Sequence, residues 1–219
     1  EIPAQEQLVD MVFAANGALL YKNTAILASF KATPRRYESK CWKEYLELCG
    51  YSTKILNNFF EGQGDALFTH KCKHLWVGYG YRTSQLAIEE LRNLAVFKNV
   101  KINELQLVDP RFYHLDTCFC PLDNTRVMCF KKAFSNLSWE NIIQTFGVEN
   151  VIEVSEVEAM NFACNSIIIG KNIIQHCGSS HLAYKLQQIG FTVWDVNMSE
   201  FLLSGGSCKC CVLLMNHRF

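Results

Sequence analysis

Polar residues able to do chemistry recur along this 219-residue chain at intervals of roughly 50 residues, a spacing typical of repeat and propeller architectures. A cysteine could supply a nucleophilic thiol, a histidine could transfer protons, and carboxylates could hold a cation. If each repeat is one blade around a central axis, equivalent positions converge on one pocket. These positions are Asp10 with Asn16, Glu61 with Asp65, His114 with Asp116, and Cys208 with Cys210 in GGSCKCC.

Hairpins and helices follow these polar stretches in a regular order. The apolar runs MVFAANGALL and NTAILASF predict a first hairpin, RRYESKCWKEYLELCG predicts a helix, and YSTKIL predicts a closing strand. Three more units repeat this order, so that the four units start near Asp10, Asp65, His114 and Asn161. We therefore predict an α/β fold in which ββαβ units form a ring, with short strands around a central channel and helices outside, rather than a doubly wound sheet.

A remainder follows the fourth unit. The run CKCCVLLM predicts a last strand that starts near Cys208 and has no hairpin partner left in the chain. Either a fifth unit takes strands from upstream of Glu1, or the ring closes in a different way. We expect residues 1–219 to form a single domain, because a hydrophobic content of 49% is enough for one substantial core.

Composition limits the classes of partner. The formal net charge is zero, which gives no electrostatic basis for binding nucleic acid or an anionic membrane. No apolar run is long enough to span a bilayer, and no signal peptide is visible. Most of the eleven cysteines lie in apolar runs, which indicates buried thiols in a reducing, cytoplasmic compartment. No cysteine pair has the spacing of a zinc site, so we predict neither a metal nor a cofactor.

An ordered set of motifs resembles the guanidino-group-modifying (pentein) enzyme superfamily. The motifs are DMVFAANGALL, FEGQGDALF, LWVGYGYRTS, VDPRFYHLDTCFC, FACNSIIIGK and MSEFLLSGGSCKCCVLL, and together they cover nearly the whole chain. The likeness is greatest to the branch that contains dimethylarginine dimethylaminohydrolases and arginine dihydrolases. It implies a five-bladed α/β-propeller, which agrees with the repeats. Of the two alternatives given above for the ring, one is that the first unit continues upstream of Glu1.

The resemblance also implies a catalytic set. Cys210 would be the nucleophile, and Cys208 and Cys211 are competing candidates. On a strand, Cys208 would lie on the same face as Cys210, whereas Cys211 would lie on the opposite face. His114 would protonate the leaving amine and then activate water. Glu61 would be the acidic partner beside the thiol. Many relatives place their two acids three residues apart, so either a bulge displaces Glu61 or Gln63 holds the place of the acid.

The remaining candidates would bind the substrate. The resemblance assigns the guanidinium to Asp65 and Asp116, and it places Asn16 where dimethylarginine hydrolases tend to carry an acid and arginine dihydrolases carry Asn. Asp10 lies close enough in the sequence to contact the same cation. Two arginines could hold an α-carboxylate through paired hydrogen bonds: Arg82 in YGYRTS and, as a second candidate, Arg111 in DPRFYHLD.

These assignments predict a cysteine hydrolase that cleaves a C–N bond of arginine or an N-methylated arginine through an S-alkylthiouronium intermediate and releases citrulline or a homologue. An arginine dihydrolase that releases ornithine stays open, as does a non-catalytic binding module of the same fold. The expected partner is a small guanidino amino acid, and a homodimer is a further expectation.

Overall fold

Four three-stranded sheets make up the β-structure of the described residues. The computed structural model describes residues 2–69 and 71–215. In every sheet the first two strands pair antiparallel and the third joins the second in parallel. The strands are β1 (Ala18–Tyr21), β2 (Thr24–Leu27) and β3 (Ser52–Ile55); β4 (Ala66–Thr69), β5 (His74–Tyr79) and β6 (Lys101–Gln106); β7 (Phe119–Pro121), β8 (Val127–Cys129) and β9 (Val151–Glu153); β10 (Ile167–Ile169), β11 (Asn172–His176) and β12 (Thr192–Val196).

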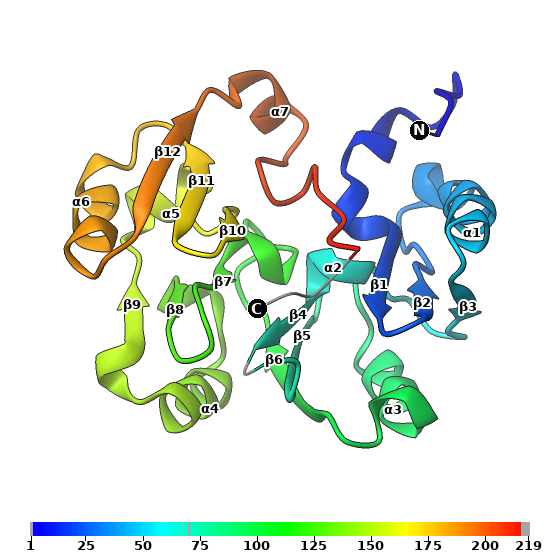
Figure 1. Cartoon of the computed structure of the whole chain (residues 1–219), viewed down its shortest axis with the longest axis horizontal. Coiled ribbons are helices and arrows are strands. Elements are labelled where there is room, and N and C mark those ends of the chain that lie inside the picture. Colours follow the sequence, from blue (N-terminus) through cyan, green and yellow to red (C-terminus); the bar gives the residue numbers. More distant parts are fainter. Residues whose placement is uncertain (1, 70, 216–219) are drawn as a thin grey trace.

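A helix connects the second and third strands of each sheet, because a parallel pair needs a crossover connection. These helices are α1 (Glu38–Leu48), α3 (Gln85–Asn93), α4 (Asn136–Phe146) and α6 (Ser180–Gln188). Figure 1 shows the sheets arranged around a common centre with these helices on the outside. The predicted ring of ββαβ units is therefore confirmed for four units. None of the helices formed by the described residues has the length and apolar character needed to span a bilayer.

The crossover helices are amphipathic, and α3 illustrates how its sequence specifies it. Its buried residues are Ala87, Ile88 and Leu91, which lie on one face at helical spacing. The Ser84 hydroxyl accepts a hydrogen bond from the backbone N–H of Leu86 and caps the first turn. The apolar face of α3 belongs to a core cluster that contains residues of β4 and β5 and also Leu19 and Ile26 of the first sheet, so the helix is buried between two neighbouring units.

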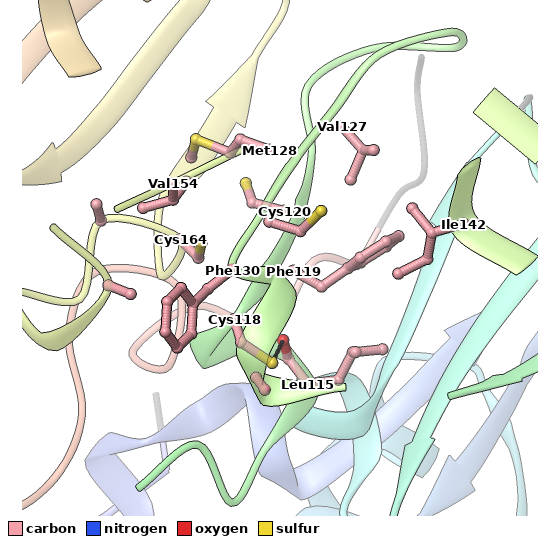
Figure 2. Packing of buried hydrophobic residues seen from close by; sticks show 14 of the residues in the cluster. Leu115, Cys118, Phe119, Cys120, Val127, Met128, Phe130, Ile142, Val154 and Cys164 are labelled. Atoms are coloured by element: carbon pink, nitrogen blue, oxygen red, sulfur yellow. Dashed lines mark hydrogen bonds between the residues drawn. The ribbon is translucent and has the colours of Figure 1, made fainter. Parts of the chain in front are cut away.

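Aromatic rings and thiols share the largest core cluster, which centres on the third sheet. Trp76 packs at 5.5 Å from Phe119, measured between ring centroids. Figure 2 shows Cys118, Cys120 and Cys164 among these apolar side chains. All eleven cysteines fall within the described residues, and all are free thiols. Burial raises the pKa of Cys120 to about 12, so this thiol behaves as a small apolar group, as the sequence predicted.

The elements that start each unit differ from the prediction. The polar stretches were expected at the first positions of strands, but they form single helical turns that precede the strands. These turns are Ala14–Gly17, α2 (Gly62–Asp65) and Leu115–Thr117, which precede β1, β4 and β7, respectively. A helical turn directs successive side chains roughly 100–120° apart, whereas a strand would alternate them between two faces.

The predicted last strand at Cys208 is wrong for the described residues. The segment 208–211 forms a turn, and the preceding run MSEFLLSGG contains the short helix α7 (Ser199–Leu203). The backbone of the turn is paired one residue at a time: Lys209 N–H donates to the Asn165 carbonyl, and Ala15 N–H donates to the Cys210 carbonyl. Among the described residues, this segment does not form the continuous backbone hydrogen bonds with a neighbouring strand that a strand would need. Glu1 and any segment before it lie outside the described residues.

Candidate active site

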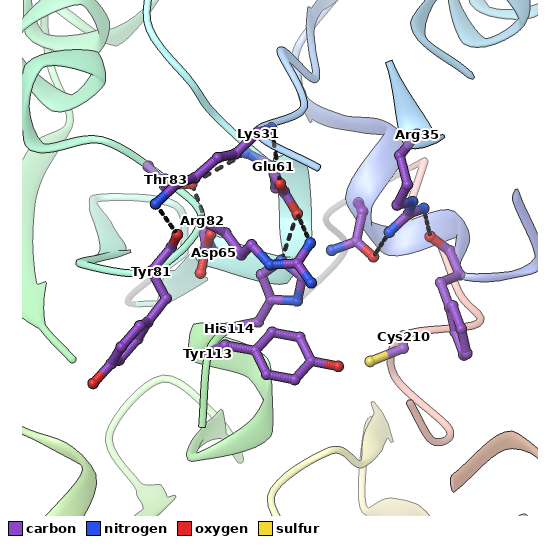
Figure 3. Close-up of polar contacts among 12 residues, drawn as sticks. Lys31, Arg35, Glu61, Asp65, Tyr81, Arg82, Thr83, Tyr113, His114 and Cys210 are labelled. Atoms are coloured by element: carbon purple, nitrogen blue, oxygen red, sulfur yellow. Dashed lines mark hydrogen bonds and ion pairs between the residues drawn. The ribbon is translucent and has the colours of Figure 1, made fainter. Parts of the chain in front are cut away.

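The helical turns of the first three units and the 208–211 turn meet at one end of the ring. One pocket at this end is lined by the Ala14–Gly17 turn, by the residues that lead into the Leu115–Thr117 turn, by the 208–211 turn, and by the segments that follow β2 and β5, whereas α2 contributes no lining residue. Figure 3 shows the polar side chains there. Close approach of the turns depends on Gly64, because a Cβ at this position would overlap Asn16 and touch the His114 ring. The lining residues are Asp10, Phe13, Asn16, Arg35, Arg82, Tyr113, His114, Ser204, Gly205 and Cys210.

A buried ion pair joins two of the predicted catalytic residues. His114 Nε2 lies 2.7 Å from Glu61 Oε2, and Glu61 is fully buried. Burial opposes ionisation of Glu61, but the hydrogen bond from His114 and the charges of His114 and Arg82 outweigh it and hold the pKa of Glu61 below its ordinary value. Burial likewise disfavours the imidazolium, yet Asp65 and Glu61 raise the pKa of His114 above its ordinary value. The pair therefore favours a protonated His114.

Asp65 lies behind this pair and does not line the pocket. Its Oδ2 accepts a hydrogen bond of 2.7 Å from the Thr83 hydroxyl, and its Oδ1 accepts one of 3.0 Å from the backbone N–H of Leu115. Complete burial raises the pKa of Asp65 to about 6 against the opposing charge of His114. The structure thus places Asp65 where it fixes the turn that carries His114, and its carboxylate oxygens are already bonded.

The Cys210 thiol is enclosed by amide and carboxylate groups. Asn165 Nδ2 donates to Sγ at 3.1 Å, and Sγ lies 3.5 Å from Asp116 Oδ2. Asn165 Oδ1 also accepts from the Cys210 backbone N–H. Burial, followed by the Asp116 charge, raises the pKa of the Cys210 thiol well above its ordinary value. The free protein therefore holds Cys210 as a thiol, which needs a cation in the pocket to become a thiolate.

Two buried polar atoms of the site have no hydrogen-bond partner among the described residues: Asp116 Oδ1 and Asn16 Nδ2. Such atoms cost free energy unless a ligand or water satisfies them. Burial raises the pKa of Asp116, against the charge of His114, so a bound cation would stabilise the ionised form. The site thus offers a carboxylate oxygen and an amide N–H₂ for a polar ligand.

Arg35 orients Asn16 and was missed by the sequence reasoning. Its Nη1 donates to Asn16 Oδ1 at 2.8 Å, which turns Asn16 Nδ2 away from the guanidinium. Its Nε and Nη2 bond to the two oxygens of Glu38 at 2.8 Å each, and Nη2 also reaches the Asp10 carbonyl. A bidentate pair of this kind is strongly directional. Asp10 therefore contributes its backbone oxygen to this network, and Figure 3 shows Arg35 on the same side of the site as Cys210.

The two arginines proposed for the substrate carboxylate occupy different places. Arg82 lines the pocket, with its Nη1 3.3 Å from Glu61 Oε2 and its guanidinium over the Tyr113 ring. Arg111 lies outside the pocket, where its Nη2 pairs with Asp109 at 2.6 Å and its Nη1 with Glu156 at 2.8 Å. The structure brings only Arg82 to the site, because these two carboxylates hold Arg111 on the surface.

The alternative residues for the acid and for the nucleophile lie in different places in the structure. Gln63 points away from His114: its Nε2 donates to the Leu214 carbonyl and its Oε1 accepts from the Leu214 N–H. Glu61, not Gln63, contacts the imidazole. Cys208 and Cys211 do not line the pocket that Cys210 lines. The strand argument used to rank these thiols does not apply, because the segment is a turn.

Asn165 is a second residue that the sequence reasoning missed. The fourth unit was expected to start near Asn161, but the side chain that faces Cys210 lies four residues later. The signal was present in the repeat: Asn165 precedes β10 by a short step, as Asn16 precedes β1 and Asp116 precedes β7. Arg35 left no comparable signal, since it lies between β2 and α1 and reaches the site through its long side chain.

Comparison with known proteins places this chain. Residues 2–216 match the family described as "N,N dimethylarginine dimethylhydrolase, eukaryotic". The chain is 36% identical over 97% of its length to the bifunctional arginine dihydrolase/ornithine cyclodeaminase AgrE of Nostoc, and 34% identical over 94% of its length to the dimethylarginine dimethylaminohydrolase of Mycobacterium tuberculosis. It spans 30% of the length of AgrE and 66% of the length of the mycobacterial enzyme.

A solved structure agrees with the fold. The N-terminal domain of ArgZ, an arginine dihydrolase from cyanobacteria that was crystallised with its substrate, superimposes with a TM-score of 0.93 at 35% identity. The alignment covers 97% of this chain and 78% of the ArgZ domain. The ββαβ ring and the match over nearly all described residues lead to one conclusion: the chain belongs to the dimethylarginine dimethylaminohydrolase family, within the pentein superfamily that includes arginine dihydrolases.

Proposed function

We propose that this chain is a cysteine hydrolase that cleaves a C–N bond of a guanidino amino acid, arginine or an N-methylated arginine. The observation that carries the proposal is the convergence of three groups on one pocket: the Cys210 thiol, the His114 imidazole and, behind it, the Glu61 carboxylate. The site also holds groups of opposite charge. Asp116 contacts the thiol and suits a cation, whereas Arg82 pairs with Glu61, lines the pocket and suits a carboxylate.

The arrangement supports a two-step reaction. Entry of a guanidinium group beside Asp116 would lower the pKa of the Cys210 thiol, so that the thiol releases its proton to water and the thiolate adds to the guanidinium carbon. A C–S bond forms, a C–N bond breaks, and the proton of His114 moves to the departing amine. The neutral His114 then takes a proton from water, which adds to the same carbon and releases Cys210. Glu61 holds His114 in place through both steps.

Arginine dihydrolase activity is the second candidate, and Asn16 favours it. Arg35 holds Asn16 Oδ1, so the group free to face a ligand is the Nδ2 donor. A donor suits the carbonyl oxygen of a ureido product better than the N–H groups of a guanidinium. A citrulline-type product held in this way could undergo a second hydrolysis to ornithine. The names of AgrE and ArgZ agree with this candidate.

A product assay tests the proposal and separates its branches. The chain is incubated with arginine, monomethylarginine, dimethylarginine and agmatine, and citrulline, ornithine, ammonia and methylamines are quantified, with Cys210→Ser as the matched control. Citrulline with a methylamine supports a dimethylarginine hydrolase, and ornithine with ammonia supports a dihydrolase. If no compound is turned over although the guanidino amino acids bind, the chain is the non-catalytic binding module instead.

The remaining expectations belong to this proposal. We infer that residues 1–219 act as one catalytic unit, since residues next to the strands of all four sheets, such as Asn16, Arg82, His114 and Asn165, meet around the turn that carries Cys210. A cytoplasmic location, a homodimer, and the lack of a nucleic-acid or membrane partner stay predictions. Gel filtration with light scattering tests the dimer directly.

A further inference from the structure

Tyr113 connects three parts of the site that are distant in the sequence. Its hydroxyl donates a hydrogen bond of 2.6 Å to the carbonyl of Gly205, which lies 92 residues later. Its ring lies under the Arg82 guanidinium, with Cζ 4.9 Å from the ring centroid, and packs edge-on against the His114 ring at 5.0 Å. Figure 3 shows the Tyr113 hydroxyl directed toward the side of the pocket where Cys210 lies.

The bond to Gly205 fastens the segment that precedes the thiol. Ser204 and Gly205 line the pocket and lead directly into the turn that carries Cys210. Gly205 has a φ of +80°, and a Cβ there would lie 2.5 Å from the Tyr113 hydroxyl oxygen. Only glycine combines this backbone conformation with so close an approach. The segment and Tyr113 therefore fit each other closely, and Cys210 is left only 3% exposed.

The contact with Arg82 fixes the direction of the guanidinium. A cation over an aromatic face is attracted to the ring, and the planar guanidinium also stacks on it. Among the described contacts only Nη1 of Arg82 is bonded, to Glu61, so the remaining N–H groups are free for a ligand. The ring limits the side-chain positions that Arg82 can adopt, and the side chain stays directed along the pocket wall.

We propose that Tyr113 is a positioning residue with two tasks: its hydroxyl closes the pocket over Cys210, and its ring holds Arg82 ready for the carboxylate of the substrate. The second task rests on the proposed function, because it requires an amino-acid substrate. The first does not, since it concerns only the accessibility of the thiol. Tyr113 would thus determine how strongly the site prefers guanidino compounds with a carboxylate over those without one.

Alkylation of Cys210 tests the first task in the absence of substrate. The chain is treated with iodoacetamide, and the tryptic peptide that begins after Lys209 is analysed, with Cys211 in the same peptide as the internal reference. Tyr113→Phe removes only the hydroxyl, and we expect it to accelerate alkylation of Cys210 on the order of three- to tenfold relative to Cys211. Tyr51→Phe is the matched control: it loses a similar bond of 2.7 Å to the Met215 carbonyl, outside the pocket. An unchanged rate in Tyr113→Phe overturns the closure.

Substrate preference tests the second task. The ratio of KM for agmatine to KM for arginine measures the preference for a carboxylate. Tyr113→Leu removes the ring, and we expect the ratio to fall on the order of two- to fivefold, while Tyr113→Phe keeps it. Tyr113→Met replaces Tyr113→Leu if that variant does not fold. If the variant that lacks the ring has the same ratio as the wild-type chain, the proposed orientation of Arg82 by Tyr113 is overturned. If the wild-type chain hydrolyses neither compound, the proposed function fails, and the alkylation result still decides whether Tyr113 closes the pocket.

Discussion

Glu61→Gln removes the carboxylate that keeps His114 protonated. In the wild-type protein, burial alone would lower the pKa of His114, and Asp65 and Glu61 together raise it. Without Glu61, burial is opposed by fewer charges, so the pKa of His114 falls. The neutral imidazole can still accept a hydrogen bond from the new amide, which preserves the contact but not the charge.

The expected loss of stability follows from the geometry. The bond between His114 Nε2 and Glu61 Oε2 is 2.7 Å long, fully buried and charge-assisted, and removal of such a bond costs about 1.5–3 kcal/mol. A buried imidazolium left unpaired would cost about 3–5 kcal/mol. The imidazole avoids that cost by releasing its proton, which takes under ~1 kcal/mol near neutral pH because the ordinary histidine pKa is about 6.5. We expect the free energy of unfolding to fall by about 2–3 kcal/mol.

The effect depends on pH in a definite direction. The pKa of Glu61 is lowered, so its contribution is complete above its unfolded pKa and is lost as the pH falls through the folded value. The pKa of His114 is raised, so its contribution is complete below its unfolded pKa and is lost as the pH rises through the folded value. The stability difference between wild type and Glu61→Gln is therefore greatest between about pH 4.5 and about pH 6.5, and declines on both sides.

Urea denaturation at a series of pH values measures this difference, and NMR titration follows the His114 ring, whose resonance is identified by its disappearance in His114→Asn. The control is Glu47→Gln, in an exposed pair with Lys43, which should leave stability unchanged within error. The coupling of the two groups would be refuted if the stability difference did not vary with pH, or if the pKa of His114 were the same in Glu61→Gln as in the wild-type protein.

Three further outcomes are expected. Cys210→Ser should abolish turnover and keep the fold, because a hydroxyl is a far weaker nucleophile than a thiolate, while Cys208→Ser and Cys211→Ser should retain activity in the same product assay. Arg82→Lys should raise KM for arginine roughly ten- to a hundredfold, with kcat little changed and agmatine unaffected, because an ammonium cannot form two parallel bonds to a carboxylate. Asn165→Ala should leave the Cys210 N–H without its partner and reduce stability by about 1–3 kcal/mol, as measured by urea denaturation.

Repetition made most of the fold predictable. Hairpins and helices recur with apolar periodicity, and that pattern depends on burial, which is a local property of each unit. The turns that precede the strands were not predictable in this way. FAANG and HLDTC carry apolar residues that fit a strand as well as a helical turn, and the choice between them is made by contacts across the ring, such as the bond from Leu115 N–H to Asp65.

The site was predictable where residue type alone suggests chemistry. His114, Glu61 and Cys210 are reactive types, and the ordered motifs suggested how they would converge. Asn165 and Arg35 act through neutral or structural contacts, which are invisible until coordinates show what they touch. The same limit applies to Asp65, which was expected to hold the ligand but has both carboxylate oxygens bonded to the protein.

The peptide of Cys210 has a consequence for how the protein loses activity. Its carbonyl accepts from Ala15 in the first unit, and its N–H donates to Asn165 in the fourth. The reactive residue therefore also links two units that are far apart in the sequence. A local opening of this short segment breaks both hydrogen bonds and removes the contacts around the thiol in one event, and it costs less free energy than global unfolding. Amide hydrogen exchange at Cys210 would report that event, and inactivation would precede the melting of the sheets.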